Sequence, residues 1–193
     1  MLIDRKFVGL HANFVGVDDE EIGVMATEHL IERGCRRIAH IRGPEVSTAV
    51  GRHEGYRRAL AMHGMVSMPG HLVVGKSTDD VSGYAAMQQL LQLVPPPDGV
   101  FCFNDPIALG AIKAILEAGL RVPEDFAVIG CGNVRYADML KVPLSSIDQD
   151  IAAIGDHAAK LALSLISAKS PVRPESILVP PKLVARDSTR PPG

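Results

Sequence analysis

The sequence contains no tryptophan, and aromatic residues make up only 4% of its 193 residues. Its cysteines are few: Cys35, Cys102 and Cys131 are odd in number and match no metal-ligand spacing. We therefore expect neither a disulfide framework nor a metal site, and a reducing cytoplasm is the expected location. No apolar run reaches the length of a transmembrane helix, and the first residues lack a signal-peptide pattern, so no membrane association is expected.

Motifs of catalysis and cofactor binding are missing as well. The seven histidines are scattered and form no HxH or HExxH pattern. A GxSxG elbow, a P-loop and a GxGxxG motif are absent. Paired acids such as Asp18-Asp19 stand at predicted helix starts, where capping explains them. We expect no enzyme activity and no cofactor, and the net charge of −2 is unlike the basic character of a nucleic-acid-binding domain.

What the sequence does contain is clearest between Val100 and Ile129. The apolar run Val100–Phe103 is typical of a strand buried on both faces. Asp105 is predicted to be the N-cap of a helix over Pro106–Ala118, because proline suits the first helical position. Phe126–Ile129 then reads as a second buried strand. This unit places Asn104 and Asp105 at the carboxyl end of a strand, where ligands bind in open α/β sheets.

The same alternation continues along the chain and predicts an α/β fold with parallel sheets covered on both faces. The predicted strands are Leu2–Asp4, Phe14–Val17, Arg37–Ile41, Leu72–Val74, Val100–Phe103, Phe126–Ile129 and Ser145–Ile147. The predicted helices are Glu20–Arg33, Thr48–His63, Asp80–Val94, Pro106–Ala118 and Ile151–Ala168.

Ordered motifs along nearly the whole chain carry a family resemblance. They are Val17-Asp18-Asp19, "ATEHLIERGCRRIAHIRGP" (Ala26–Pro44), "GRHEGYRRAL" (Gly51–Leu60), "ND-x-x-A-x-G-A" with "G-L-x-V-P-x-D-x-x-V-x-G" (Asn104–Gly130), "VPLSSIDQD" (Val142–Asp150) and "LVARDST" (Leu183–Thr189). In this order they resemble the effector-binding domain of LacI/GalR-type bacterial transcription regulators. The segments "GNVRYADML" and "SGYAAMQQLL" look closest to the purine-repressor branch.

The resemblance implies a periplasmic-binding-protein-like fold of two Rossmann-like lobes with parallel sheets. It assigns residues 1–44 and 149–176 to the amino-terminal lobe, and residues 45–148 and 177–193 to the carboxy-terminal lobe. Family members begin with a helix-turn-helix head, whereas the match here starts at Leu2–Arg5, inside the amino-terminal lobe. We therefore expect an incomplete amino-terminal lobe and no DNA-reading head, in either a fragment or a shortened gene product.

The resemblance also points to ligand-binding residues. Arg52 matches an arginine that the family uses as an effector ligand, and a guanidinium suits carboxylates, phosphates and vicinal hydroxyls. Asn104 is expected to contact the ligand through its amide, whereas Asp105 is expected only to cap its helix. Ser47 and Thr48 lie where the family places polar ligand contacts, although either could instead be a helix N-cap.

Other candidate positions leave alternatives open or depart from the family pattern. Asp18 and Gln149 match polar positions that border the cleft, but helix capping and helix-start polarity explain them equally well. Ser77 stands where relatives often place a stacking aromatic, so a flat purine-like effector is disfavoured. The family's acidic ligand contact is replaced by Gly132. Either the effector is unusual, or its contacts are redistributed to Asn133, or regulation by ligand has been lost.

We interpret the chain as the effector-sensing domain of a LacI/GalR-type regulator that binds a small polar, sugar-like ligand between its lobes. DNA would be contacted only through the absent head. Leu109 and Leu140 are expected at a two-fold homodimer contact. The alternatives are a solute-binding protein of the same fold that serves a sugar transporter, and a vestigial fragment without ligand function.

Overall fold

The computed structural model describes residues 1–7, 9–168 and 173–189. Helices and strands alternate along most of the chain, as predicted. In order they are β1 (Leu2–Ile3), β2 (Phe14–Gly16), α1 (Asp19–Glu32), β3 (Ile38–Arg42), α2 (Ser47–Met62), β4 (Leu72–Val74), α3 (Asp80–Leu90), β5 (Gly99–Cys102), α4 (Asp105–Glu117), β6 (Ala127–Cys131), β7 (Ser145–Asp148), α5 (Ile151–Ser167), β8 (Ser176–Leu178), β9 (Lys182–Val184) and the short 3₁₀ helix η1 (Asp187–Thr189).

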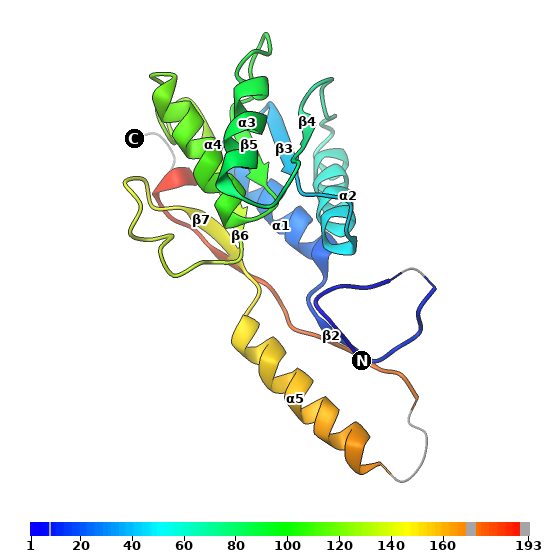
Figure 1. The fold of residues 1–193 in the computed structure, drawn as a ribbon. Helices are drawn as coiled ribbons and strands as arrows, with labels where there is room; N and C mark the ends of the chain where they lie inside the picture. The colour runs from blue at the N-terminus through cyan, green and yellow to red at the C-terminus, as the bar shows by residue number, and fades with distance from the viewer. Residues whose placement is uncertain (8, 169–172, 190–193) are drawn as a thin grey trace.

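The strands form two sheets (Figure 1). The larger sheet has six strands in the order β4-β3-β5-β6-β7-β9, and only the β7–β9 pair is antiparallel. The smaller sheet has three parallel strands in the order β1-β2-β8. Parallel neighbours bring their carboxyl ends to one edge of a sheet, which is where ligands bind in this class of fold.

The central strands of the larger sheet are buried on both faces, which confirms the prediction for this region. Ala39, Ile41 and Val100 pack into one apolar cluster with α3 and α4. Their neighbours Ile38 and Phe101 pack into a second cluster with α1 and α2. Because side chains alternate along a strand, each strand supplies both clusters. The result is a sheet with a helical layer on either side.

The smaller sheet is covered less completely. Helix α5 packs against β2, and it buries only Ile154, Ala158 and Leu161. In Figure 1 this helix extends away from the larger sheet. We call the six-stranded sheet with α1 to α4 the larger lobe, and the three-stranded sheet with α5 the smaller lobe.

The strand pairing divides the chain differently from the expected boundaries. Strand β3 pairs with β4 and β5, and α1 packs against α2, so residues 19–44 belong to the larger lobe and not to the amino-terminal one. Strand β8 pairs with β2 in the smaller sheet, although most of it was assigned to the carboxy-terminal lobe. Such pairings join distant segments, and local periodicity does not encode them.

Candidate ligand-binding site

Helices α1 and α2 cross in close contact through glycines. A Cβ atom at Gly23 would clash with the backbone of Arg52, and one at Gly55 would clash with the backbone of α1. At Gly51, a Cβ atom would lie 2.7 Å from the Cβ of Asp19. Only glycine allows backbones to approach so closely. The crossing therefore sets Asp19 of α1 beside Arg52 of α2.

Arg52 is a buried cation held by two hydrogen bonds. Only 4% of the residue is exposed. Its Nε donates to Asp19 Oδ1 at 3.0 Å, and its Nη1 donates to the carbonyl of Phe103 at 2.7 Å. The guanidinium carbon also lies 4.7 Å from the centroid of the Phe103 ring. Its Nη2 makes no hydrogen bond to the described residues, so donors remain at the carboxyl end of β5.

The charges around Arg52 are mainly negative. Burial raises the pKa of Asp19, although Arg52 acts in the opposite direction, and the negative charges of Asp4 and Asp18 raise it further. Burial disfavours the charged form of Arg52, yet its neighbours, including Asp19 and Asp4, leave its pKa above the usual value. Arg52 is therefore the charged centre of an acid-rich site.

Asn104 lies at the same end of β5, as predicted. Its Oδ1 accepts a hydrogen bond from the backbone N–H of Ile107 at 2.9 Å, which makes it the N-cap of α4. Its Nδ2 donates to the carbonyl of Thr78 at 2.9 Å. Arg52 binds the carbonyl of Phe103, the residue before Asn104, so both residues lie at the carboxyl end of β5. Whether Asn104 also contacts a ligand stays a prediction.

The prediction that Asp105 caps α4 is wrong. Asp105 is the first residue of the helix and is fully buried. Its Oδ1 accepts from the Ser146 hydroxyl at 2.7 Å, and its Oδ2 accepts from the backbone N–H of Val134 at 2.8 Å. Burial raises the pKa of Asp105, against the effect of both hydrogen bonds. Its side chain thus ties α4 to β7 and to the connection that precedes β7.

Asn133 is held by protein groups on both sides of its amide. Its Nδ2 donates to Asp148 Oδ2 at 3.0 Å, and its Oδ1 accepts from Arg186 Nη2 at 2.7 Å. The preceding Gly132 has a φ of 124° and Asn133 one of 47°, which are backbone conformations that favour glycine and asparagine. A Cβ atom at Gly132 would lie 3.6 Å from Asp105 Oδ2. An acid at position 132 would therefore be strained and would face a second carboxylate.

The hydroxyls of Ser47 and Thr48 do not cap α2, so the capping alternative is wrong for both. Val46 is the N-cap residue, and the helix has no side-chain cap. The Ser47 hydroxyl accepts from the backbone N–H of Lys6 at 2.9 Å, and Thr48 is buried. Within the described part of the chain, the first N–H groups of α2 thus have no side-chain acceptor.

The remaining candidates occupy three different connections. Asp18 caps α1 by accepting from the backbone N–H of Glu20 at 2.9 Å. Gln149 is buried between β7 and α5. The backbone N–H of Ser77, just after β4, donates to the Ser82 hydroxyl at 3.3 Å. Ligand contact by Asp18, Gln149 and Ser77 stays a prediction.

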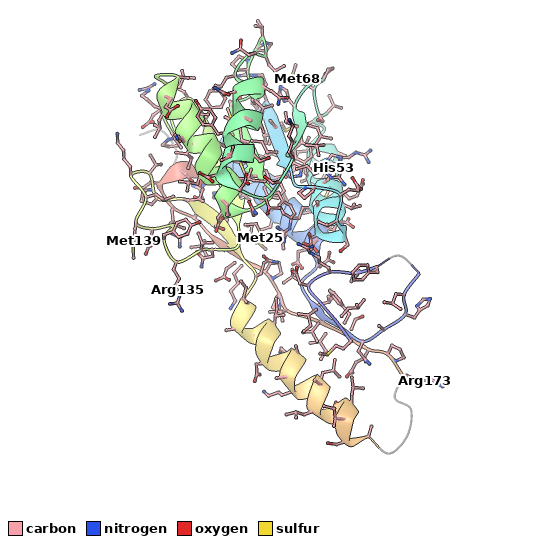
Figure 2. The ribbon with its side chains drawn as sticks, in the orientation of Figure 1. Met25, His53, Met68, Arg135, Met139 and Arg173 are labelled. Atoms are coloured by element: carbon pink, nitrogen blue, oxygen red, sulfur yellow. The ribbon has the colours of Figure 1, made fainter. Side chains whose placement is uncertain are left out.

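Leu109 and Leu140, the predicted dimer contacts, line one surface groove. The groove has a volume of about 460 Å³ and lies between α4 and the β6–β7 connection. Ile112 and Val142 add to its apolar lining. Figure 2 shows Met139 on the same connection, with its side chain directed outward. The two half-buried leucines thus line the same groove, and Arg52 is not among its lining residues.

Sequence reasoning missed several residues that organise the site. They are Asp19, Phe103, Asp148 and Arg186. The spacing of Gly51 and Gly55 could have predicted a close helix crossing, but not which helix would cross. Among residues 1–7, 9–168 and 173–189, no three or more histidine, cysteine or acidic side chains gather for a metal ion. Within the same ranges, no helix is long and apolar enough to span a bilayer.

Comparison with known proteins agrees with the fold. Residues 27–189 match the model of the periplasmic binding protein-like domain. The HTH-type transcriptional repressor PurR of Mannheimia succiniciproducens is 38% identical over 171 residues, which are 88% of this chain and 51% of the repressor. The chain thus spans about half the length of the repressors that it matches.

Two solved structures superpose over almost the whole chain. The transcriptional regulator CelR in complex with cellobiose has a TM-score of 0.90 at 33% identity, and covers 97% of this chain and 58% of its own. A sugar-binding transcriptional regulator of the LacI family from Escherichia coli, complexed with phosphate, has a TM-score of 0.88 at 26% identity. That match covers 100% of this chain and 68% of the regulator.

Proposed function

The chain belongs to the periplasmic-binding-protein-like domain family, and we propose that it acts as the effector sensor of a LacI/GalR-type transcription regulator. A small polar effector would bind at the carboxyl end of β5. The observation that carries this proposal is Arg52, a buried guanidinium that makes two hydrogen bonds to the described residues, neither of them through Nη2. A charge is costly to bury, so a site that retains such donors is suited to a polar ligand.

The effector is proposed to be sugar-like rather than a purine. Ser77 offers no ring on which a flat base could stack, and Gly132 offers no acid to a ring N–H. The regulators of similar structure were captured with cellobiose and with phosphate. The PurR similarity indicates ancestry, and the site residues, not overall identity, decide which ligand fits.

Ligand binding would act through the relative position of the lobes. The chain crosses between them at residues 17–18, 149–150 and 179–181, between elements of the two sheets. A ligand that favours one arrangement of the lobes shifts the population toward it. We propose that a DNA-reading segment outside this chain would convert that shift into operator affinity, in the cytoplasm, and that the chain itself catalyses no reaction.

We further propose a homodimer through the groove that Leu109 and Leu140 line. An apolar groove on a soluble domain is a common protein contact, and a two-fold axis would pair it with its own copy. Leu109→Asp should shift sedimentation of the wild-type dimer toward the monomer. The same change at Val81, an exposed residue of α3, is the control. A wild type that is monomeric at tens of micromolar would contradict the dimer.

The ligand proposal is tested by calorimetric titration of the intact chain with sugars that include cellobiose. We expect one sugar to bind saturably at one site per chain. Arg52→Gln, combined with Asp19→Asn to avoid a buried lone acid, should weaken it about tenfold or more, the effect of losing a charged hydrogen bond. Arg57→Ala, on the exposed face of the same helix, should have no effect. Equal affinity in all variants, or no saturable sugar, would refute the proposal.

A further inference from the structure

The acids around Arg52 bear on which ligands the site accepts. Asp19 pairs directly with the guanidinium at 3.0 Å, and the two side chains are only 13% and 5% exposed. The negative charges of Asp4 and Asp18 reach the same carboxylate. The Asp19–Arg52 pair therefore lies among further negative charge, and charges in a partly buried site are poorly screened by salt.

Nearby positive charge offsets these acids only in part: even with Lys6 counted beside Arg52, two cations lie among the three carboxylates of Asp4, Asp18 and Asp19. Arg42, at the end of β3, is matched by Glu45 through two hydrogen bonds of 2.8 and 3.0 Å. The ammonium of Lys6 lies 4.5 Å from the centroid of the Phe14 ring. The first turn of α1 carries Asp19, Glu20 and Glu21, which offset the positive end of its dipole.

Donors and acceptors are nevertheless both present. The Nη2 of Arg52 and the first N–H groups of α2 can donate, while the carboxylates of Asp19 and Asp4 can only accept when ionised. A hydroxyl group both donates and accepts, so a polyol can satisfy the two kinds of group together. A phosphate dianion only accepts, and it would add its charge to that of the acids.

We propose that the Asp19–Arg52 pair makes this site selective for uncharged, hydroxyl-rich ligands and excludes phosphorylated or carboxylated ones. This inference rests on the proposed ligand role of Arg52. It separates this chain from a regulator of the same fold that was captured with phosphate. Asp19 acts as a specificity residue: it orients Arg52 and cancels the charge that would otherwise attract an anion.

Inorganic phosphate is the direct probe, because it needs no knowledge of the natural effector. Phosphate is titrated by calorimetry into the intact chain, with ionic strength held constant by sodium chloride. We expect no saturable binding by the wild type in the low millimolar range. Asp19→Asn keeps an oxygen for Arg52 Nε and should bind phosphate at least tenfold more tightly. The double variant with Arg52→Gln should lose this gain.

Two further variants make the result specific. Asp4→Asn should produce a smaller gain than Asp19→Asn, without touching the ion pair. Glu54→Gln frees the exposed Arg57 on the outer face of α2 and should behave as the wild type. The inference would be overturned if the wild type binds phosphate and the double variant Arg52→Gln with Asp19→Asn does not. Arg52 would then remain a ligand residue. Folded Asp19→Asn and Asp4→Asn variants that both gain nothing would also overturn the inference.

The sugar titrations separate this inference from the proposed function. Glucose and glucose 6-phosphate are compared on the wild type and on Asp19→Asn. If the wild type binds glucose 6-phosphate more tightly than glucose, and the Arg52 variant loses that binding, only the proposed selectivity is contradicted. If the substitutions of Arg52 and Asp19 change the affinity for neither the sugars nor phosphate, the proposed ligand-binding site itself is contradicted.

Discussion

Both lobes combine a β-sheet with helices, but only the sheet of the larger lobe is covered by helices on both faces. In the larger lobe, α4 buries Ile107, Ala111 and Ile115 completely against the sheet. In the smaller lobe, α5 leaves Leu163 66% and Ile166 81% exposed. An amphipathic helix is stabilised mainly by packing of its apolar face, so α5 has only part of the support that α4 has.

Further apolar side chains of the smaller lobe are exposed near the same sheet. They are Ile3, Phe7, Leu10 and Leu178. Large apolar patches are seldom left in water, and open strand edges recruit other chains. We therefore expect that another polypeptide completes the smaller lobe or, without one, that this lobe is less ordered than the larger one.

The largest contrast is expected from truncating one apolar side chain in each lobe. Phe101 is fully buried at the centre of the larger sheet, so Phe101→Ala should lower the free energy of unfolding by about 3–5 kcal/mol. Leu163→Ala on α5 should change it by less than about 0.5 kcal/mol, as for a surface residue. Urea denaturation measures both. Equal losses would mean that α5 is packed as tightly as the core.

A smaller effect is expected from acid, through a histidine of the larger lobe. Burial lowers the pKa of His40 to about 3 from its usual 6.5, and its ring stacks on Phe101 with centroids 4.6 Å apart. The folded state thus favours neutral His40, so stability is present above pH 6.5 and is lost as the pH falls toward 3.

At pH 5, this loss should reach about 2 kcal/mol relative to pH 7.5 for a group that titrates normally when unfolded. His40→Leu should remove the loss of stability that protonation of His40 causes, so the unfolding free energy should vary less with pH. Urea midpoints at the two pH values measure it. A variant with the wild-type pH slope would show that His40 does not titrate as its burial implies.

The smallest effect concerns the link between the regions. Arg186 donates to Asn133 Oδ1 and to the carbonyl of Leu144, each at 2.7 Å, and Asn133 in turn binds Asp148 at the crossing into α5. Arg186→Ala should cost about 1.5 kcal/mol, the value of a charged hydrogen bond. Chemical denaturation gives the cost, with Arg135→Ala, an exposed residue of the β6–β7 connection (Figure 2), as control. If Arg186→Ala leaves the free energy of unfolding unchanged, the hydrogen bonds of Arg186 do not contribute to stability.

Most of the fold could be predicted from local pattern. Val100–Phe103 lies within one residue of β5, and Leu72–Val74 is β4 itself. Helix α3 ends at Leu90 and not at Val94, and β8, β9 and η1 were not predicted. Those three short elements are held by pairing with distant strands or by distant hydroxyls such as Ser145, which hydrophobic periodicity does not reveal.

The site could be predicted only in part. Arg52 and Asn104 lie at one end of β5 as expected, because strand ends in a parallel sheet share an edge. Asp19 was interpreted only as a capping residue, and its pairing with Arg52 depends on a helix crossing. Asn104 is the N-cap of α4 in place of Asp105. Both residue types suit an N-cap, and only the backbone path decides between them.

Amide hydrogen exchange on the intact chain, at a concentration where sedimentation proves a monomer, tests the contrast between the lobes most directly. We predict that β3, β5 and β6 exchange only through global unfolding, whereas β1, β2, β8 and the second half of α5 open locally and exchange at least about tenfold faster. Uniform, strong protection of both sheets in a proven monomer would show instead that the smaller lobe is self-sufficient and that the contrast between the lobes does not exist.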